Sequence, residues 1–174
     1  HRHDHHHHEH HHHDTKPSGQ EETHLVTEAP ANHAHTHYAD IDRLIAGSHL
    51  APPVRTRARH IFRLLAEAEA AAHGMPVEDV AFHEVGSIDS IMDVVMAAYC
   101  LEQVGPARCC ASPIRPGRGF VNIAHGTHPV PPPASARLLA GMPVAGTPDA
   151  IKRENVELST PAGIAILKSL APEF

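Results

Sequence analysis

The chain has 174 residues, a length typical of one domain plus a tail, and its formal charge is −6 when its 20 histidines are counted as neutral. Lys and Arg total 14 against 20 acidic residues, and four Phe, two Tyr and no Trp offer little stacking surface, so we expect no nucleic-acid partner. An apolar run of about 18 residues is lacking and the three cysteines form no C-x-x-C pair, so we expect no membrane span, no disulfide framework and a cytoplasmic location.

The chain opens with a histidine tract, in which ten of the first thirteen residues are histidine. Imidazole is a common ligand of nickel, zinc and copper, and its pKa of about 6.5 leaves it able to coordinate at neutral pH. A purification tag is the alternative, but tags are uniform and this run is interrupted by Arg2, Asp4 and Glu9. The tract and a second cluster of alternating histidines supply these candidate metal ligands: His1, His3, His5, His6, His7, His8, His10, His11, His12, His13, His33, His35 and His37.

Residues 1–37 carry almost no apolar side chains, so they cannot bury enough surface to offset the entropy of ordering. We therefore expect a disordered, histidine-rich metal-binding segment followed by one domain over residues 38–174. The expected elements of that domain are helix 40–47, helix 53–73, strand 80–85, helix 87–104, strand 108–114, strand 120–124, helix 134–140, strand 156–159 and a last helix that Thr160 caps. Short strands that alternate with helices predict an α/β layered domain.

Two of these helices differ in pattern. Apolar residues recur every three or four positions over residues 53–73 and Gly74 follows, which predicts an amphipathic helix with a glycine C-cap. The helix over residues 87–104 is apolar around most of its circumference, so we expect it at the centre of the core, with Cys100 buried.

Between the strand at 80–85 and the next helix lies the run FHEVGSIDSIMD. His83 and Glu84 are neighbours on a strand and face opposite ways, whereas Asp89 and Asp93 share one helix face. Gly86-Ser87 at the helix start offers backbone N–H groups to an anion such as phosphate. Alternatively, these residues serve only to end a strand, form a turn and begin a helix. A carboxylate such as Asp93 buried on an apolar helix nevertheless favours a functional role.

A second run, GRGFVNIAHGTHPVPPPAS, combines a glycine-flanked turn with two histidines. The turn lets the backbone approach a ligand closely, and Arg118 offers a partner for phosphate or carboxylate. His125 and His128 lie where a strand leaves for a loop, although a solvent-exposed His128 is an equal alternative. A third run, ELSTPAGIAIL, places Thr160 at a helix start, where simple capping also explains it.

Taken together and in this order after a histidine-rich segment, the three runs resemble the LarC-type nickel-insertion family. The resemblance covers residues 38–170 and implies a nickel chelatase of the lyase class. It implies insertion of Ni²⁺ into pyridinium-3,5-bisthiocarboxylic acid mononucleotide, the precursor of the nickel-pincer cofactor of lactate racemase, with CTP and Mg²⁺ or Mn²⁺. Members carry further segments at both ends, so we expect this chain to correspond to the middle of such a protein.

Under this hypothesis the histidine tract captures nickel and passes it to the pyridinium compound. The expected catalytic residues are His83, Glu84, Asp89 and His125; the expected cofactor-binding residues are Gly86, Ser87, Arg118 and Thr160; and Asp93 and His128 join the tract as metal ligands. The lactate racemase apoenzyme is an expected recipient.

Two other functions remain open. The chain is alternatively a nickel-storage or metallochaperone module, in which the histidine tract does the work and the domain is a docking platform. A zinc hydrolase is less well supported, because no H-E-x-x-H motif is present. The sequence also leaves the oligomeric state open, including a homo-oligomer.

Overall fold

The computed structural model describes residues 36–83, 85–123, 126–151 and 154–174. The histidine tract and the expected disorder therefore lie outside the described residues, and of the segment over residues 1–37 only Thr36 and His37 lie within them. The elements in chain order are β1 (Thr36–His37), α1 (Tyr38–Ala46), α2 (Pro52–His73), a 3₁₀ turn η1 (Val77–Asp79), β2 (Ala81–Phe82), α3 (Ile88–Val104), β3 (Gly117–Arg118), β4 (Phe120–Ile123), β5 (Gly126–Pro129), α4 (Pro133–Leu138), β6 (Val156–Glu157) and α5 (Pro161–Ser169).

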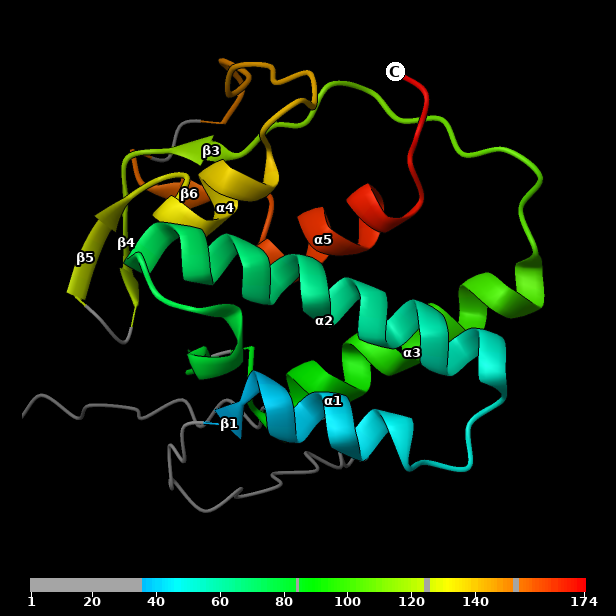
Figure 1. Ribbon diagram of the computed structural model, residues 1–174. Helices are drawn as coiled ribbons and strands as arrows, with labels where there is room; N and C mark the ends of the chain where they lie inside the picture. The colour runs from blue at the N-terminus through cyan, green and yellow to red at the C-terminus, as the bar shows by residue number, and fades with distance from the viewer. Residues whose placement is uncertain (1–35, 84, 124–125, 152–153) are drawn as a thin grey trace, which may run out of the picture. The chain divides into compact units, whose positions relative to one another are not determined.

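Helix α2 organises the core, as the ribbon shows (Figure 1). It packs against α1 and α3 on one side and α4 and α5 on the other. Its predicted apolar stripe is buried from Val54 to Ala68, and Phe62, which lies beside that stripe, is buried as well. The helix begins with two prolines, and Gly74 ends it in the left-handed conformation (φ 68°) with its N–H bonded to the Ala70 carbonyl.

The strands are short and lie in three separate antiparallel pairs: β1 with β2, β3 with β6, and β4 with β5. The mixed α/β composition is confirmed, but helices rather than a sheet carry the core of the described residues. The expected strand over residues 108–114 is wrong. Only isolated bridges form there, from Cys110 to Glu173 and from Ile114 to Val144, because Pro113 removes a ladder N–H between them.

Helix α3 has the predicted bounds but not the predicted burial. Ser87 precedes it and Gly105 ends it in the left-handed conformation, as expected. Within the helix only Val94 and Ala98 are fully buried, and Cys100 is exposed, so the expected central position is wrong. The physical reason is that α3 packs mainly against α2 and α5, which cover one face, and its opposite face is largely exposed in the described part of the chain.

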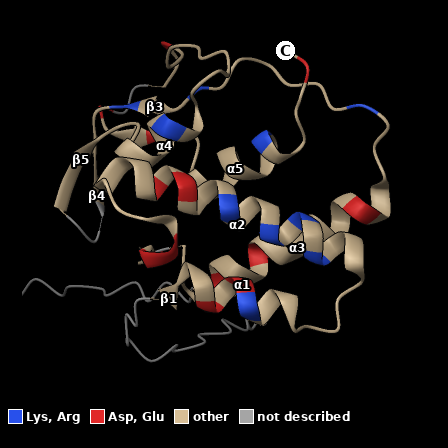
Figure 2. Ribbon diagram, viewed as in Figure 1, with Lys and Arg blue, Asp and Glu red and all other residues tan. Residues whose placement is uncertain are grey.

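Charged side chains link the helices at the surface (Figure 2). Arg59 contacts Asp42 of α1 (Nε–Oδ1 2.7 Å) and Arg57 contacts Glu102 of α3 (Nε–Oε1 2.6 Å). The charged face of α2 is therefore a paired surface between neighbouring helices. Among the described helices, none is both long enough and apolar enough to cross a membrane.

Candidate functional site

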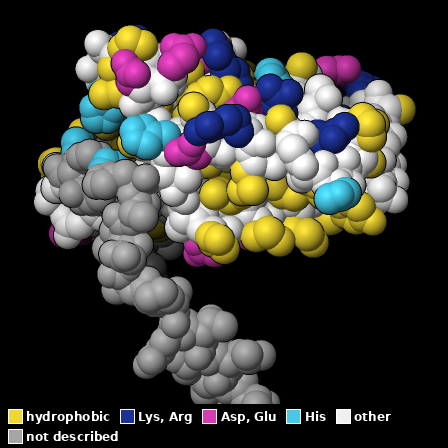
Figure 3. Space-filling model, turned by 60° about the horizontal axis from the view of Figure 1, so that its bottom comes forward, with side chains coloured by type: hydrophobic (Ala, Val, Ile, Leu, Met, Phe, Trp, Pro, Cys, Tyr) yellow, Lys and Arg dark blue, Asp and Glu magenta, His cyan; other side chains and the backbone are white. Residues whose placement is uncertain are grey.

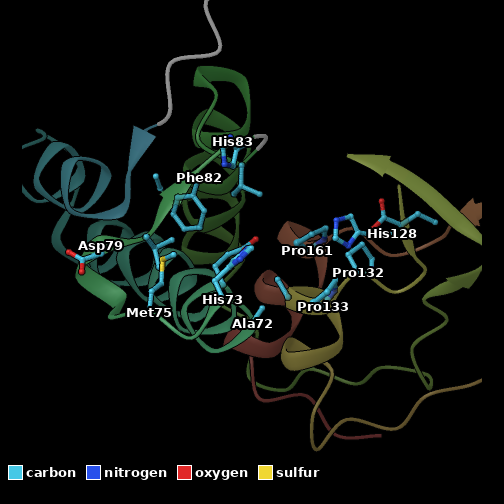
Figure 4. A pocket seen from close by; sticks show the side chains of 16 residues that line it. Ala72, His73, Met75, Asp79, Phe82, His83, His128, Pro132, Pro133 and Pro161 are labelled. Atoms are coloured by element: carbon cyan, nitrogen blue, oxygen red, sulfur yellow. The ribbon is translucent and has the colours of Figure 1, made fainter. Parts of the chain in front are cut away.

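A pocket of about 250 Å³ lies at the C-terminal end of α2 (Figure 4). Its walls come from α2, from the segment around β2, from β5 with the start of α4, and from β6 with the start of α5. The lining residues are Glu69, Ala72, His73, Met75, Asp79, Val80, Ala81, Phe82, His83, Val85, His128, Pro132, Pro133, Ala134, Glu157 and Pro161. Segments that are far apart in the sequence thus meet at one cavity.

Three imidazoles from three different elements line this pocket. His73 comes from the last turn of α2, His83 follows β2, and His128 lies on β5 opposite Val121 of β4. In the close-up view His128 lies across the pocket from Phe82 (Figure 4). The structure therefore brings together His83 and His128, which the sequence analysis named in two separate motifs.

The sequence analysis missed His73, which it treated only as the end of a helix. Its Nε2 atom lies 3.4 Å from Oε2 of Glu69, one helical turn earlier. A carboxylate beside an imidazole fixes the orientation of the ring, as in the outer shell of many metal sites. The available signal was this i, i+4 pairing of Glu69 with His73 at a helix C-terminus, where the helix dipole favours cations.

Apolar side chains complete the pocket walls. Phe82 is buried and its ring centroid lies 6.2 Å from that of Phe62 in the core, so one wall is anchored to the main hydrophobic cluster. Pro132, Pro133 and Pro161 form the wall near His128 (Figure 4). An apolar cavity with a few polar groups is the usual form of a small-molecule site.

The pocket is not a complete metal cage. Within the described ranges, no group of three His, Cys, Asp or Glu side chains is close enough to hold one metal ion. The three imidazoles are instead distributed around the cavity, so a metal bound by one of them would keep coordination positions for other ligands.

In the first motif, Gly86 and Ser87 stand just before α3, where a phosphate contact was expected and stays a prediction. Gly86 is buried, and an added Cβ would lie 2.8 Å from the Phe82 carbonyl oxygen and 3.0 Å from Thr36 Cβ, so close packing explains this glycine. The hydroxyl oxygens of Ser87 and Ser90 lie 2.9 Å apart. Glu84 lies outside the described residues.

The two acidic residues of the first motif lie on α3 and do not line the pocket. Asp93 is exposed, so the expectation that it is a buried carboxylate is wrong. Asp89 is also exposed, and hydrogen bonds from the Ser87 hydroxyl and the Ser90 backbone lower the pKa of its carboxyl below the ordinary value. This shift reflects helix capping by local groups.

The glycine-flanked turn lies close to the backbone of β6. A Cβ on Gly117 (φ 109°) would lie 2.0 Å from the Val156 carbonyl oxygen, so glycine is required for β3 to pair with β6. Arg118 is exposed and donates from Nη2 to the Ile151 carbonyl at 2.7 Å. His125, between β4 and β5 in the sequence, lies outside the described residues.

Thr160 has the capping geometry that the sequence predicted. Its hydroxyl oxygen accepts a hydrogen bond from the Gly163 N–H at 3.3 Å, and Pro161 follows at the first helical position. Pro161 lines the pocket, whereas Thr160 itself does not.

Comparison with known proteins identifies the family of this chain. The model of the family described as nickel insertion protein matches residues 2–174. A relative from Geobacillus kaustophilus, the pyridinium-3,5-bisthiocarboxylic acid mononucleotide nickel insertion protein, is 44% identical over 139 residues, which are 80% of this chain and 33% of that protein.

A candidate nickel insertion protein from Pelobacter propionicus is 54% identical over 134 residues (77% of this chain, 33% of the relative), and one from Citrifermentans bemidjiense is 48% identical over 149 residues (86% and 37%). The matched stretch thus spans about a third of the length of these curated relatives. No solved structure matches. The chain belongs to the nickel insertion protein family.

Proposed function

We propose that this chain takes part in inserting Ni²⁺ into pyridinium-3,5-bisthiocarboxylic acid mononucleotide, and that the pocket at the end of α2 is where metal and pyridinium ring meet. The observation that carries the proposal is the convergence of His73, His83 and His128 on one apolar cavity in a member of the nickel insertion family. The name of the relative from Geobacillus kaustophilus supplies the substrate.

The chemistry of the pocket suits this pair of reactants. Nickel favours imidazole and sulfur donors in tetragonal surroundings, and the mononucleotide offers two thiocarboxylates and a ring carbon. Because the described imidazoles do not form a full cage, the substrate itself would complete the coordination sphere. Phe82 on one wall and Pro132 and Pro133 on the opposite wall give a flat aromatic ring apolar surfaces to lie against.

Formation of the nickel–carbon bond displaces the proton of that ring carbon, so the site needs a proton acceptor. His73 is suited to this role by its position, since it lines the pocket and its Nε2 atom lies 3.4 Å from the Glu69 carboxylate, which orients the ring. His83 and His128 then remain as the imidazoles that guide nickel into the pocket. Glu84 and His125 stay candidate residues from the sequence.

The nucleotide CTP with Mg²⁺ or Mn²⁺ enters this proposal only through the family resemblance. In the described part of the chain no acidic cluster fits such an ion. The start of α3, expected to contact phosphate, has its glycine packed against Phe82. The proposed steps therefore involve only nickel, the pyridinium compound and the residues of the pocket. We further propose a cytoplasmic chelatase of the lyase class that supplies the lactate racemase apoenzyme.

A second function, nickel storage or delivery, is favoured by one observation, the ten histidines among the first thirteen residues. That function needs only the histidine-rich segment. Removal of residues 1–37 would abolish it, whereas insertion from nickel supplied in solution would continue.

The test is nickel transfer to the thiolated pyridinium mononucleotide, with and without CTP and Mg²⁺, followed as activation of lactate racemase apoenzyme. The Geobacillus kaustophilus relative serves as the positive control. We expect this chain to bind the mononucleotide and to yield the nickel product. If the relative yields product while this chain binds nickel but not the mononucleotide, the storage function replaces the proposal.

A further inference from the structure

The outward face of α3 is an apolar surface without a described neighbour on it. Ile88, Met92, Met96, Tyr99 and Val104 are 81%, 52%, 52%, 46% and 75% exposed. Their spacing places them on one side of the helix, opposite the buried Val94 and Ala98. Figure 3 shows hydrophobic side chains gathered along one edge of the described body. Contiguous exposed patches of this kind mark interaction surfaces.

The apolar residues of this face are arranged symmetrically about Met96. Met92 and Cys100 lie four residues to either side of it, and Ile88 and Val104 lie eight residues to either side. All five are exposed. If two copies of α3 lie antiparallel and cross at Met96, each residue of these pairs meets its mate on the other copy, so in both pairs an apolar side chain meets an apolar side chain.

The polar residues of the same face obey the same symmetry. Asp93 and Tyr99 lie three residues to either side of Met96, and Asp89 and Gln103 lie seven residues to either side. All four are exposed. An antiparallel pair therefore sets each carboxylate against a hydrogen-bond donor, either a phenol hydroxyl or an amide. A parallel pair would set each carboxylate against its own copy, and like charges in contact are unfavourable.

We propose that the outward face of α3 is a homodimer interface, on which a second copy of this chain packs antiparallel with the two-fold axis at Met96. A two-fold interface must be self-complementary, because residue i meets residue j and j meets i. The arrangement of the eight side chains around Met96 has this property. The proposal is independent of the nickel chemistry.

Disulfide trapping tests the axis directly. In a background with Cys100→Ser, Cys109→Ser and Cys110→Ser, Met96→Cys places a thiol on the axis, where the two copies come within the Cα spacing that a disulfide needs. We expect a linked dimer on mild oxidation. Val144→Cys in the same background is the matched control, since Val144 is 53% exposed but lies outside α3. Equal linking at the two positions would overturn the proposal.

The native thiol supplies a second control. Cys100 faces Met92 of the other copy in this geometry, so the two Cys100 thiols lie far from each other, about 12 Å along the helix axis at 1.5 Å per residue. We expect the Met96→Cys variant to link faster than a chain that keeps only Cys100. The reverse order would overturn the antiparallel register.

Mass measurements by light scattering test the interface without cross-linking. The unmodified chain should shift from monomer to dimer as its concentration rises, and Met96→Glu should stay monomeric with an unchanged circular dichroism spectrum. Val144→Glu, the matched control, should dimerise like the unmodified chain. A chain that stays monomeric at every concentration would overturn the proposal and leave the face to another partner, such as the remaining two thirds of the longer relatives.

Discussion

The two longest helices, α2 and α3, contrast in composition and in burial. Helix α2 carries charged residues along much of its length, yet eight of its residues are buried. Helix α3 is the more apolar sequence, yet only two of its residues are buried. The difference lies in their neighbours: α2 has α1, α3, α4 and α5 around it, and α3 packs mainly against α2 and α5. Burial thus follows from the number of packing partners rather than from the apolar content of the helix.

The contrast in burial predicts that removing one large side chain from each helix changes the free energy of unfolding by very different amounts. Phe62→Ala in α2 should lower the free energy of unfolding by about 3–5 kcal/mol, because Phe62 is fully buried and packs near Phe82. Met92→Ala in α3, at a dilution where the chain is monomeric, should change it by less than about 0.5 kcal/mol. Urea denaturation measures both, and equal losses would contradict the contrast.

A change at the helix ends should affect the two helices equally. Gly74 and Gly105 both end their helices in the left-handed conformation, with φ of 68° and 55°. Alanine at either position should cost about 1 kcal/mol, the strain of a Cβ in that conformation. The same denaturation experiment checks this, and a much larger cost at Gly74 would mean that packing, rather than local conformation, sets its role.

The ion pair between α2 and α3 should contribute less to the free energy of unfolding than the helix-ending glycines. Arg57 of α2 and Glu102 of α3 form an ion pair with about a quarter of each side chain exposed. Arg57→Ala should lower the free energy of unfolding by about 0.5 kcal/mol, and the double-mutant cycle with Glu102→Ala should give a coupling of that size. Zero coupling would show that the pair adds nothing to helix docking.

The smallest expected effect is a pH dependence at the start of α3. The carboxyl of Asp89 has a lowered pKa in the folded chain, so its contribution to stability is present above the unfolded pKa and is lost as pH falls through the folded pKa. The stability difference between the unmodified chain and Asp89→Asn should therefore be constant near neutral pH and vanish in acid. A difference that stays constant through the whole acid range would contradict this cause.

Local signals predicted most of the helices. The periodicity of α2, the glycines that end α2 and α3, and the cap at Thr160 all depend on residues close in sequence, and the structure confirms them. The position of α3 and the pairing of the short strands depend on partners far along the chain. For that reason the expected strand over residues 108–114 and the expected burial of Cys100 are wrong.

In the site, too, the sequence predicted individual residues but not the contacts between distant segments. His83 and His128 stood out in separate motifs, but only the fold brings them to one pocket and adds His73 to them. Gly86 and Gly117 pack closely against Phe82 and Val156, which accounts for the missing Cβ at both positions, and their expected contact with a ligand stays a prediction. A single sequence cannot distinguish these two uses of glycine, since both require a missing Cβ.

If nickel is inserted in the pocket at the end of α2, variants of that pocket should lose insertion while the amount of bound nickel stays the same. His73→Ala and His83→Ala should each lower the rate of nickel insertion by at least about tenfold, because loss of even an outer partner of a metal site costs this much. His60→Ala, an exposed residue of α2 that does not line the pocket, is the matched control and should insert nickel at the unmodified rate. Nickel held by the histidine tract should be the same in all four proteins. Unchanged insertion in both pocket variants, with the control also unchanged, would contradict the assignment of this pocket.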